Sequence, residues 1–281
     1  LFNYMQGILD QTSKDGFYIL TGSNNFLLQQ SISQSLAGRI GYIDLLPLCY
    51  SEILQFKTKD DSIEEMILNG SYPELYDKNR NPSLWYPAYI RTYIERDVKQ
   101  IRNIENTILF NRFLQLCAGR TAQQLNVSAL SNETGVEIKT IQAWLSILQS
   151  SYIVYLLPPY HKNFNKRVVK TPKLYFLDTG LACSLLGIRG KKELENSHFR
   201  GALFENYIIM ELLKQKLNTG SNAGFYYWKE NNGLEIDLLI DTGKNMIAHE
   251  IKSTLTYNDT LLKSLQQWQK VSKSNNGVLL Y

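Results

Sequence analysis

Asp237, Glu250 and Lys252 could act together, because they fall within residues 234–254, a segment that predicts two β-strands joined by a tight turn. Side chains alternate between the two faces of a strand. Asp237 projects from the acidic face of the first predicted strand, and Glu250 and Lys252 share one face of the second. The aliphatic face of the first strand is predicted to carry Leu234, Ile236, Leu238 and Ile240. The hairpin can therefore bring Asp237, Glu250 and Lys252 together.

These residue types in this arrangement have a chemical use. Carboxylate oxygens are the ligands that Mg²⁺ prefers, and a neighbouring lysine can support an attacking water or a developing negative charge. The sequence therefore predicts Asp237 and Glu250 as magnesium ligands and Lys252 as a catalytic residue. The alternative is an ion-pair cluster that stabilises the hairpin, because Glu-x-Lys occurs by chance in many strands.

A third acid belongs to a predicted helix over residues 200–217. Its stripe through Ala202, Ile209 and Leu212 is apolar except for Glu205. An acid on a face that points to the core needs a reason, since an unpaired buried charge is costly. Glu205 is therefore added to the candidate catalytic residues.

The predicted order is a helix with Glu205, three strands, a helix over 261–271 and a strand over 277–281. This order, with Asp237 followed by Glu250-Ile251-Lys252, resembles the PD-(D/E)xK nuclease superfamily. The resemblance implies an αβββαβ core, a Mg²⁺ cofactor bound by Asp237 and Glu250, assistance from Glu205, and a water oriented by Lys252. Ile236 stands where many members have proline. An inherited fold without turnover remains the alternative.

The first part of the chain shows an α/β pattern. Apolar strands are predicted over 17–20 and 40–45, with a helix over 26–37 between them and a polar turn at 21–25. The phrases YILTGSNNFLL, SLAGR and LLPLCYSEI resemble the second half of the core of a prokaryotic AAA-type P-loop ATPase family. The resemblance implies nucleotide sensors at Asn24 and Arg39. No Walker A motif occurs in the chain, so ATP is expected as a cofactor only of a longer chain.

Residues 111–180 predict a helix-turn-helix with a β-wing. Helices are expected over 128–134 and 138–148, with Lys139 and Gln142 on the outer side of the second. The loop before the strand 173–176 carries four basic residues and no acid, namely Lys162, Lys166, Arg167 and Lys170. Such a basic footprint predicts contact with DNA. A protein-interaction module or a simply solvated surface is the alternative.

The composition limits the choice of function without fixing it. The 281 residues carry a net charge of +4 with a pI near 8.7, which permits nucleic-acid binding without requiring it. Three separated cysteines and the lack of a long apolar run favour a reduced, cytoplasmic protein without a membrane span. We expect a monomer or weak dimer, with a protein partner as the alternative to DNA.

The expected fold class is α/β plus α+β, with four parts joined in part by a flexible linker over 187–197. These parts are the C-terminal part of an AAA-type ATPase core (1–57), a helical lid-like region (58–110), a winged helix-turn-helix (111–180) and a PD-(D/E)xK nuclease-like domain (181–281).

Overall fold

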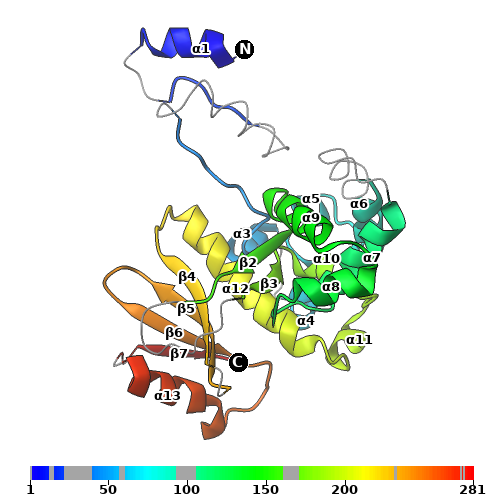
Figure 1. Cartoon of the computed structure of the whole chain (residues 1–281), viewed down its shortest axis with the longest axis vertical. Helices are drawn as coiled ribbons and strands as arrows, with labels where there is room; N and C mark the ends of the chain where they lie inside the picture. The colour runs from blue at the N-terminus through cyan, green and yellow to red at the C-terminus, as the bar shows by residue number, and fades with distance from the viewer. Residues whose placement is uncertain are drawn as a thin grey trace.

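The computed structural model contains two sheets packed among helices (Figure 1). It describes residues 2–12, 16–21, 40–56, 61–92, 106–160, 171–230, 233–272, 274 and 276–281. The predicted helix over 26–37 and residues 93–105 lie outside the described residues. Within the described residues, the architecture is mixed α/β.

The C-terminal sheet has the strand order β4-β5-β6-β7. β4, β5 and β6 are antiparallel neighbours, and β7 runs parallel to β6. Helix α12 covers one face and α13 the other (Figure 1). The bounds are Arg200–Asn218 for α12, Gly224–Lys229 for β4, Glu235–Asp241 for β5, Met246–Ile251 for β6, Lys263–Ser272 for α13 and Gly277–Leu280 for β7. The short 3₁₀ helix η3, Asp259–Leu262, precedes α13.

The side chains of β5 reverse their alternation between the two faces of the sheet in the middle of the strand. Tyr226 of β4 pairs with Leu239 and Trp228 pairs with Ile236, so β5 has one more residue than β4 between these pairs. Leu234 and Ile236 consequently pack on the α13 side, whereas Leu238 and Ile240 pack on the α12 side. The predicted single aliphatic face is therefore wrong. An extra residue in one strand reverses the alternation and re-aims the side chains beside it, and here that place is Asp237 and Leu238.

A second, three-stranded sheet lies in the middle of the chain. Its order is β1-β3-β2, and both pairs are antiparallel. The helices α7, α8 and α9 pack beside it. The bounds are Thr107–Ala118 for α7, Gln123–Gln124 for β1, Val127–Thr134 for α8, Ile138–Ser150 for α9, Val154–Leu157 for β2 and Lys173–Phe176 for β3.

Local sequence explains the two predicted helices of this region. The side chain of Asn126 accepts a hydrogen bond from the backbone of Ala129 and begins α8, and Gly135 ends it with a left-handed backbone. In α9 the periodic residues Ile141, Leu145 and Leu148 are buried as predicted. Ile138, at the first position, remains 46% exposed.

The N-terminal strands predicted from the α/β pattern are not formed. After α1, Phe2–Leu9, residues 16–21 and 40–46 have no regular secondary structure. Ile19 is 88% exposed and Ile43 is 93% exposed. An apolar strand of this kind is stable only between neighbouring strands and helix layers, and none lies beside these segments among the described residues.

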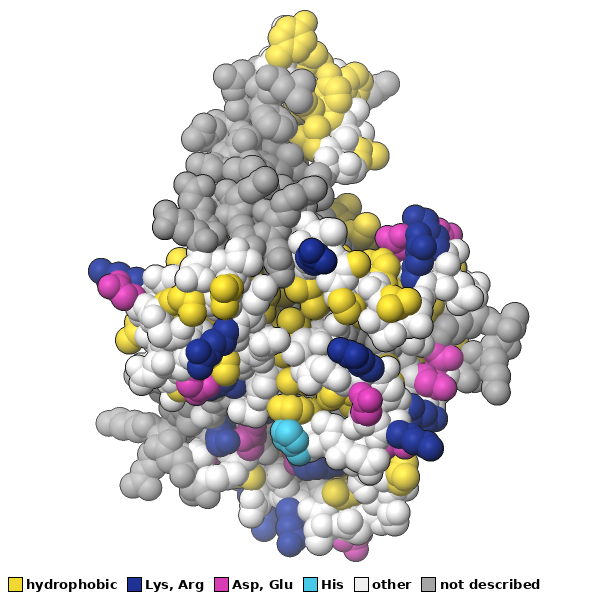
Figure 2. Space-filling model, turned by 90° about the vertical axis from the view of Figure 1, so that its right-hand side faces the viewer, with side chains coloured by type: hydrophobic (Ala, Val, Ile, Leu, Met, Phe, Trp, Pro, Cys, Tyr) yellow, Lys and Arg dark blue, Asp and Glu magenta, His cyan; other side chains and the backbone are white. Residues whose placement is uncertain are grey.

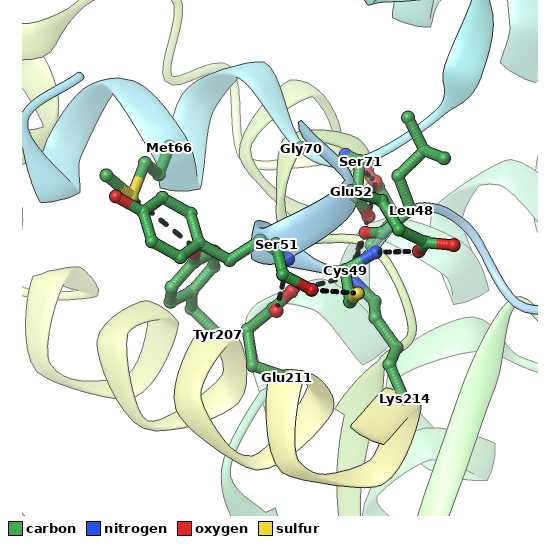
Figure 3. Close-up of polar contacts among 12 residues, drawn as sticks. Leu48, Cys49, Ser51, Glu52, Met66, Gly70, Ser71, Tyr207, Glu211 and Lys214 are labelled. Atoms are coloured by element: carbon green, nitrogen blue, oxygen red, sulfur yellow. Dashed lines mark hydrogen bonds and ion pairs between the residues drawn. The ribbon is translucent and has the colours of Figure 1, made fainter. Parts of the chain in front are cut away.

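Two buried charged residues of α12, Glu211 and Lys214, hold residues 48–50 against the rest of the protein (Figure 3). The Lys214 ammonium donates to Glu211 at 2.8 Å, to the Leu48 carbonyl at 2.9 Å and to the Ser71 hydroxyl at 2.9 Å. Glu211 in turn accepts a 2.7 Å hydrogen bond from the backbone of Tyr50 at the start of α3, Tyr50–Ile53. The charges are paired, so their burial is tolerated.

Shorter helices complete the body. They are η1 Leu54–Phe56, α4 Ile63–Asn69, α5 Pro73–Asp77, α6 Pro82–Tyr89, α10 Thr179–Leu185 and α11 Lys191–Glu195. Helix α11 falls inside the segment 187–197 that was predicted to be a flexible linker, and its Leu194 is fully buried. That prediction is wrong, because Ile188 and Leu194 are both buried in the core and hold the polar segment against it. A single hydrophobic cluster extends from Ile67 in α4 to Ile251 in β6.

Gly70 gives a test of the packing between α4 and α10. Its φ is +64°, and an added Cβ would lie 2.0 Å from the Tyr86 hydroxyl and 2.6 Å from both carboxylate oxygens of Asp178. We expect Gly70→Ala to lower the free energy of unfolding by at least ~3 kcal/mol, through backbone strain and steric overlap together. Gly135 is the control for a left-handed backbone without steric overlap, since its φ is +75° and its Cβ would meet no atom within 4 Å. Gly135→Ala should cost ~1–2 kcal/mol from strain alone in a urea unfolding titration, and equal losses would contradict the steric argument.

Candidate active site

The structure brings Asp237, Glu250 and Lys252 together at one end of the C-terminal sheet. Asp237 on β5 and Glu250 on β6 are 5% and 3% exposed. The Lys252 ammonium, just after β6, lies 3.3 Å from Asp237 Oδ2 and 2.7 Å from Glu250 Oε1. The backbone N–H of Ile251 also donates to Asp237 Oδ2 at 2.8 Å. The extra residue in β5 is at this position, so the bulge aims the Asp237 carboxylate toward Lys252.

Glu205 of α12 lies in the same cluster of charged residues. Its Oε1 accepts hydrogen bonds from the Lys173 ammonium at 3.0 Å and from the Tyr175 hydroxyl at 2.6 Å. Burial, together with the nearby charge of Asp237, raises the pKa of Glu205 to about 7, while Lys173 opposes the shift. Glu205 is therefore linked to Asp237 through Lys173, whose ammonium lies 3.9 Å from Asp237 Oδ1.

Sequence reasoning missed Lys173, Tyr175 and Glu235 as members of this cluster. Lys173 is 3% exposed and lies 2.5 Å from Glu235 Oε1 as well as beside Glu205. Burial opposes the charged form of Lys173, yet the carboxylates of Glu205, Asp237 and Glu235 raise its pKa well above the ordinary value. The available signal was a lysine in the otherwise apolar strand 173–176, since a buried lysine requires acidic partners.

The two sheets are linked where Lys173 enters the cluster. The backbone of Tyr160, beyond β2, donates to Tyr227 of β4 at 2.8 Å, and Tyr227 donates back to Pro158 at 3.0 Å. The Tyr227 hydroxyl donates to the carbonyl of Thr171, and its ring lies 5.6 Å from the Lys173 ammonium. These contacts hold the segment around β3 against the C-terminal sheet. Lys173 therefore lies beside acidic residues that are far from it in the sequence.

Glu250 has the unusual electrostatic environment expected of a functional group. Burial and the charge of Asp237 raise its pKa to about 7, against the effect of Lys252. Oε2 of Glu250 is buried and has no hydrogen-bond partner among the described residues. The Ser264 hydroxyl lies near this carboxyl and lowers its pKa. One carboxylate oxygen is therefore left with unused acceptor capacity.

The donor set suits one divalent cation bound by two carboxylates. Among the residues that the structure describes, no group of three or more His, Cys, Asp and Glu side chains is placed to hold a metal ion. Mg²⁺ usually keeps several waters and takes one or two protein carboxylates. Asp237 and the unpaired Oε2 of Glu250 fit that requirement, because a cation there would also relieve the repulsion between the two acids.

The predicted nucleic-acid residues are only partly described. Lys139 and Gln142 are exposed on α9, an element separate from those that build the acid cluster. On the face seen in Figure 2, described basic and acidic side chains are interspersed and do not form one basic patch. The remaining predicted contacts and the nucleotide sensors lie outside the described residues, namely Lys162, Lys166, Arg167, Lys170, Asn24 and Arg39. Within the described ranges, no helix is both long and apolar enough to cross a membrane.

Three protein families match consecutive parts of the chain. An AAA domain matches residues 1–54, a domain of unknown function (DUF8612) matches 60–192, and a second domain of unknown function (DUF4143) matches 200–281. The acid cluster draws on both the second and the third match, because Lys173 and Tyr175 precede residue 192.

Three curated relatives are similar over most of the chain. An uncharacterized protein of Mycobacterium tuberculosis is 26% identical over 258 residues, which cover 91% of this chain and 56% of the relative. An uncharacterized protein of Methanocaldococcus jannaschii is 26% identical, covering 85% of this chain and 57% of the relative. One of Haemophilus influenzae is 23% identical, covering 90% and 64%.

The chain thus spans between 56% and 64% of the length of these relatives. No solved structure matches the chain. The matches to the AAA domain and to the C-terminal domain together indicate an AAA-type ATPase-like family.

Proposed function

We propose that this chain is the C-terminal portion of an AAA-type ATPase-related protein and carries a divalent-cation-dependent nuclease site of the PD-(D/E)xK type. The observation that carries the proposal is the cluster of Asp237, Glu250 and Lys252, in which Glu250 Oε2 is buried without a partner. The elements around it follow the order α12–β4–β5–β6–α13–β7, which is compatible with the αβββαβ order of that superfamily.

The protein residues have distinct roles in this proposal. Asp237 and Glu250 would hold Mg²⁺, which supplies Lewis-acid stabilisation of a phosphodiester and an activated water. Burial opposes the charge of Lys252, but Asp237 and Glu250 raise its pKa, so it stays protonated at neutral pH. It therefore donates a hydrogen bond to the attacking water or to a phosphate oxygen and cannot act as the base. In the metal-free chain, burial and the charge of Asp237 raise the pKa of Glu250 to about 7, so binding of Mg²⁺ at neutral pH would displace a proton from this carboxyl.

DNA is the proposed substrate, and the helices α8 and α9 with strands β2 and β3 are its proposed winged-helix binding unit. Lys139 and Gln142 are exposed on one side of α9, where side chains of a recognition helix would meet base edges and phosphates. The basic residues between β2 and β3 extend this footprint in sequence. ATP is proposed as a cofactor only where a Walker A motif is present in the same protein.

The decisive test is cleavage of supercoiled plasmid with Mg²⁺ or Mn²⁺ and without either cation. We expect cation-dependent nicking by the parent chain and at least ~100-fold slower nicking by Asp237→Asn and by Lys252→Ala, because each removes a group that contacts the reacting atoms. Asp241→Asn, at the other end of β5, is the matched control and should cleave as the parent does. Cation-independent nicking, or equal nicking by all variants, would exclude this site.

A non-catalytic binding module for nucleic acid or protein is the second candidate. It is favoured by the pairing of Lys252 with both acids, because a closed ion-pair network also serves as a structural link. This reading predicts no cleavage by any variant and a gel shift with DNA that Asp237→Asn leaves unchanged, whereas loss of charge at Lys139 weakens it.

A further inference from the structure

The cluster around Lys173 differs from the pair of acids at Lys252, although the two are connected. Lys173 comes from β3, and its ammonium lies within 4.0 Å of Glu205, Glu235 and Asp237. It is 3% exposed, whereas the side chain of Lys252 is 40% exposed. A single buried ammonium thus lies where three carboxylates converge.

Three carboxylates that face one point favour a positive charge at that point. Oxygen ligands from carboxylates are what Mg²⁺ and Mn²⁺ require, and mutual repulsion of the acids favours any positive charge between them. The ammonium of Lys173 already supplies that charge and satisfies the acids with short contacts of 3.0 Å to Glu205 and 2.5 Å to Glu235. An internal cation of this kind excludes a second, mobile one.

One acceptor of this network has no ammonium beside it. Ion pairs connect four carboxylates, Glu205, Glu235, Asp237 and Glu250, with three ammonium groups, Lys173, Lys229 and Lys252. The unpaired buried oxygen, Glu250 Oε2, lies on the Lys252 side and not on the Lys173 side.

We propose that Lys173 is a built-in cation that fills the position between Glu205, Glu235 and Asp237, so that the cluster takes a single divalent ion at Asp237 and Glu250. Lys173 is thus a positioning residue contributed by β3, and it sets the number of cations in the site. The inference deepens the proposed nuclease function and rests on it for the ion at Asp237 and Glu250.

The test is the number of Mn²⁺ ions bound per chain, counted from free Mn²⁺ by electron paramagnetic resonance and repeated by titration calorimetry. The parent chain should bind one ion, and Lys173→Met should bind two. Adding Glu205→Gln to Lys173→Met should remove the second ion. Lys214→Met is the matched control, since Lys214 is equally buried but is paired with the single carboxylate of Glu211, and it should still bind one.

The outcomes separate this inference from the proposed function. One ion in both the parent chain and a folded Lys173→Met would overturn the role of Lys173. No ion in the parent chain, with no change in Glu250→Gln, would overturn the site at Asp237 and Glu250. In that event a single ion gained by Lys173→Met and lost with Glu205→Gln would still support the inference.

Loss of Lys173 leaves three facing acids, so Lys173→Met requires a second readout if it does not fold in metal-free buffer. Refolding with Mn²⁺ present then decides the question by circular dichroism. Recovery of the native spectrum with Mn²⁺, but not with an equal ionic strength of KCl, would support the inference. No recovery with either salt, under conditions in which Lys214→Met refolds, would contradict it.

Discussion

Asp178→Ala is expected to lower the free energy of unfolding by ~3–5 kcal/mol, because it leaves several buried donors without an acceptor. Asp178 is 2% exposed. Its Oδ1 accepts from the Leu181 backbone at 2.8 Å and the Tyr86 hydroxyl at 2.7 Å. Its Oδ2 accepts from the Ser71 backbone at 2.7 Å and the Ser71 hydroxyl at 3.1 Å. One carboxylate therefore begins α10 and fastens it to the segment after α4 and to α6.

Differential scanning calorimetry and urea titration measure this loss, which should lower Tm by roughly 10 °C for a chain of this length. Asp178→Asn is the graded control. Its carbonyl oxygen still serves Leu181 and Tyr86, but its amide group faces the N–H of Ser71, so we expect about half of the effect. A loss below ~1 kcal/mol for Asp178→Ala would show that water replaces the carboxylate and that the site is not sealed.

The helices and strands with complete local signals were predictable from the sequence. α8 has an asparagine at its start and a glycine at its end, and α9 repeats apolar residues at helical spacing, so both were predicted to within a few residues. The N-terminal strands were not, although 17–20 and 40–45 are apolar. A buried strand depends on partners that its own residues do not specify, and the described segments 16–21 and 40–46 have none.

The candidate site also combines contacts that local sequence predicts with contacts that it does not. Asp237, Glu250 and Lys252 belong to one hairpin, so strand alternation and a short turn were enough to predict that they meet. The alternation itself fails at the bulge in β5, which depends on the pairing with β4. Lys173 and Tyr175 reach Glu205 across 32 and 30 residues of sequence. Their meeting depends on how β3 packs against α12 and β4, which no local pattern encodes.

The acid cluster makes the stability of the metal-free chain fall as the pH rises. The pKa values of Glu205 and Glu250 are raised to about 7, mainly by burial and by Asp237, and the unfolded value is ~4.3. Between these values the folded state holds protons that the unfolded state has released. Each group therefore stabilises most at pH values below its unfolded pKa, and its contribution is lost as the pH rises through ~7, by up to ~1.4 kcal/mol per pH unit.

Urea titrations of the metal-free chain at several pH values between 5 and 8 test this slope against Glu250→Gln and Glu205→Gln. Each substitution should flatten the decline, and their effects should not add because both acids interact with Asp237. Glu64→Gln is the control without a slope, because burial would raise the pKa of Glu64 but Arg200 lowers it below its usual value. The carboxyl therefore titrates below pH 5 in both the folded and the unfolded state, and this substitution should leave the decline between pH 5 and 8 unaltered. Saturating Mg²⁺ should reduce the decline in the parent chain, since a cation binds the deprotonated carboxylates, and should not do so in Glu250→Gln. A decline that neither glutamine variant alters would contradict the raised pKa values of Glu205 and Glu250.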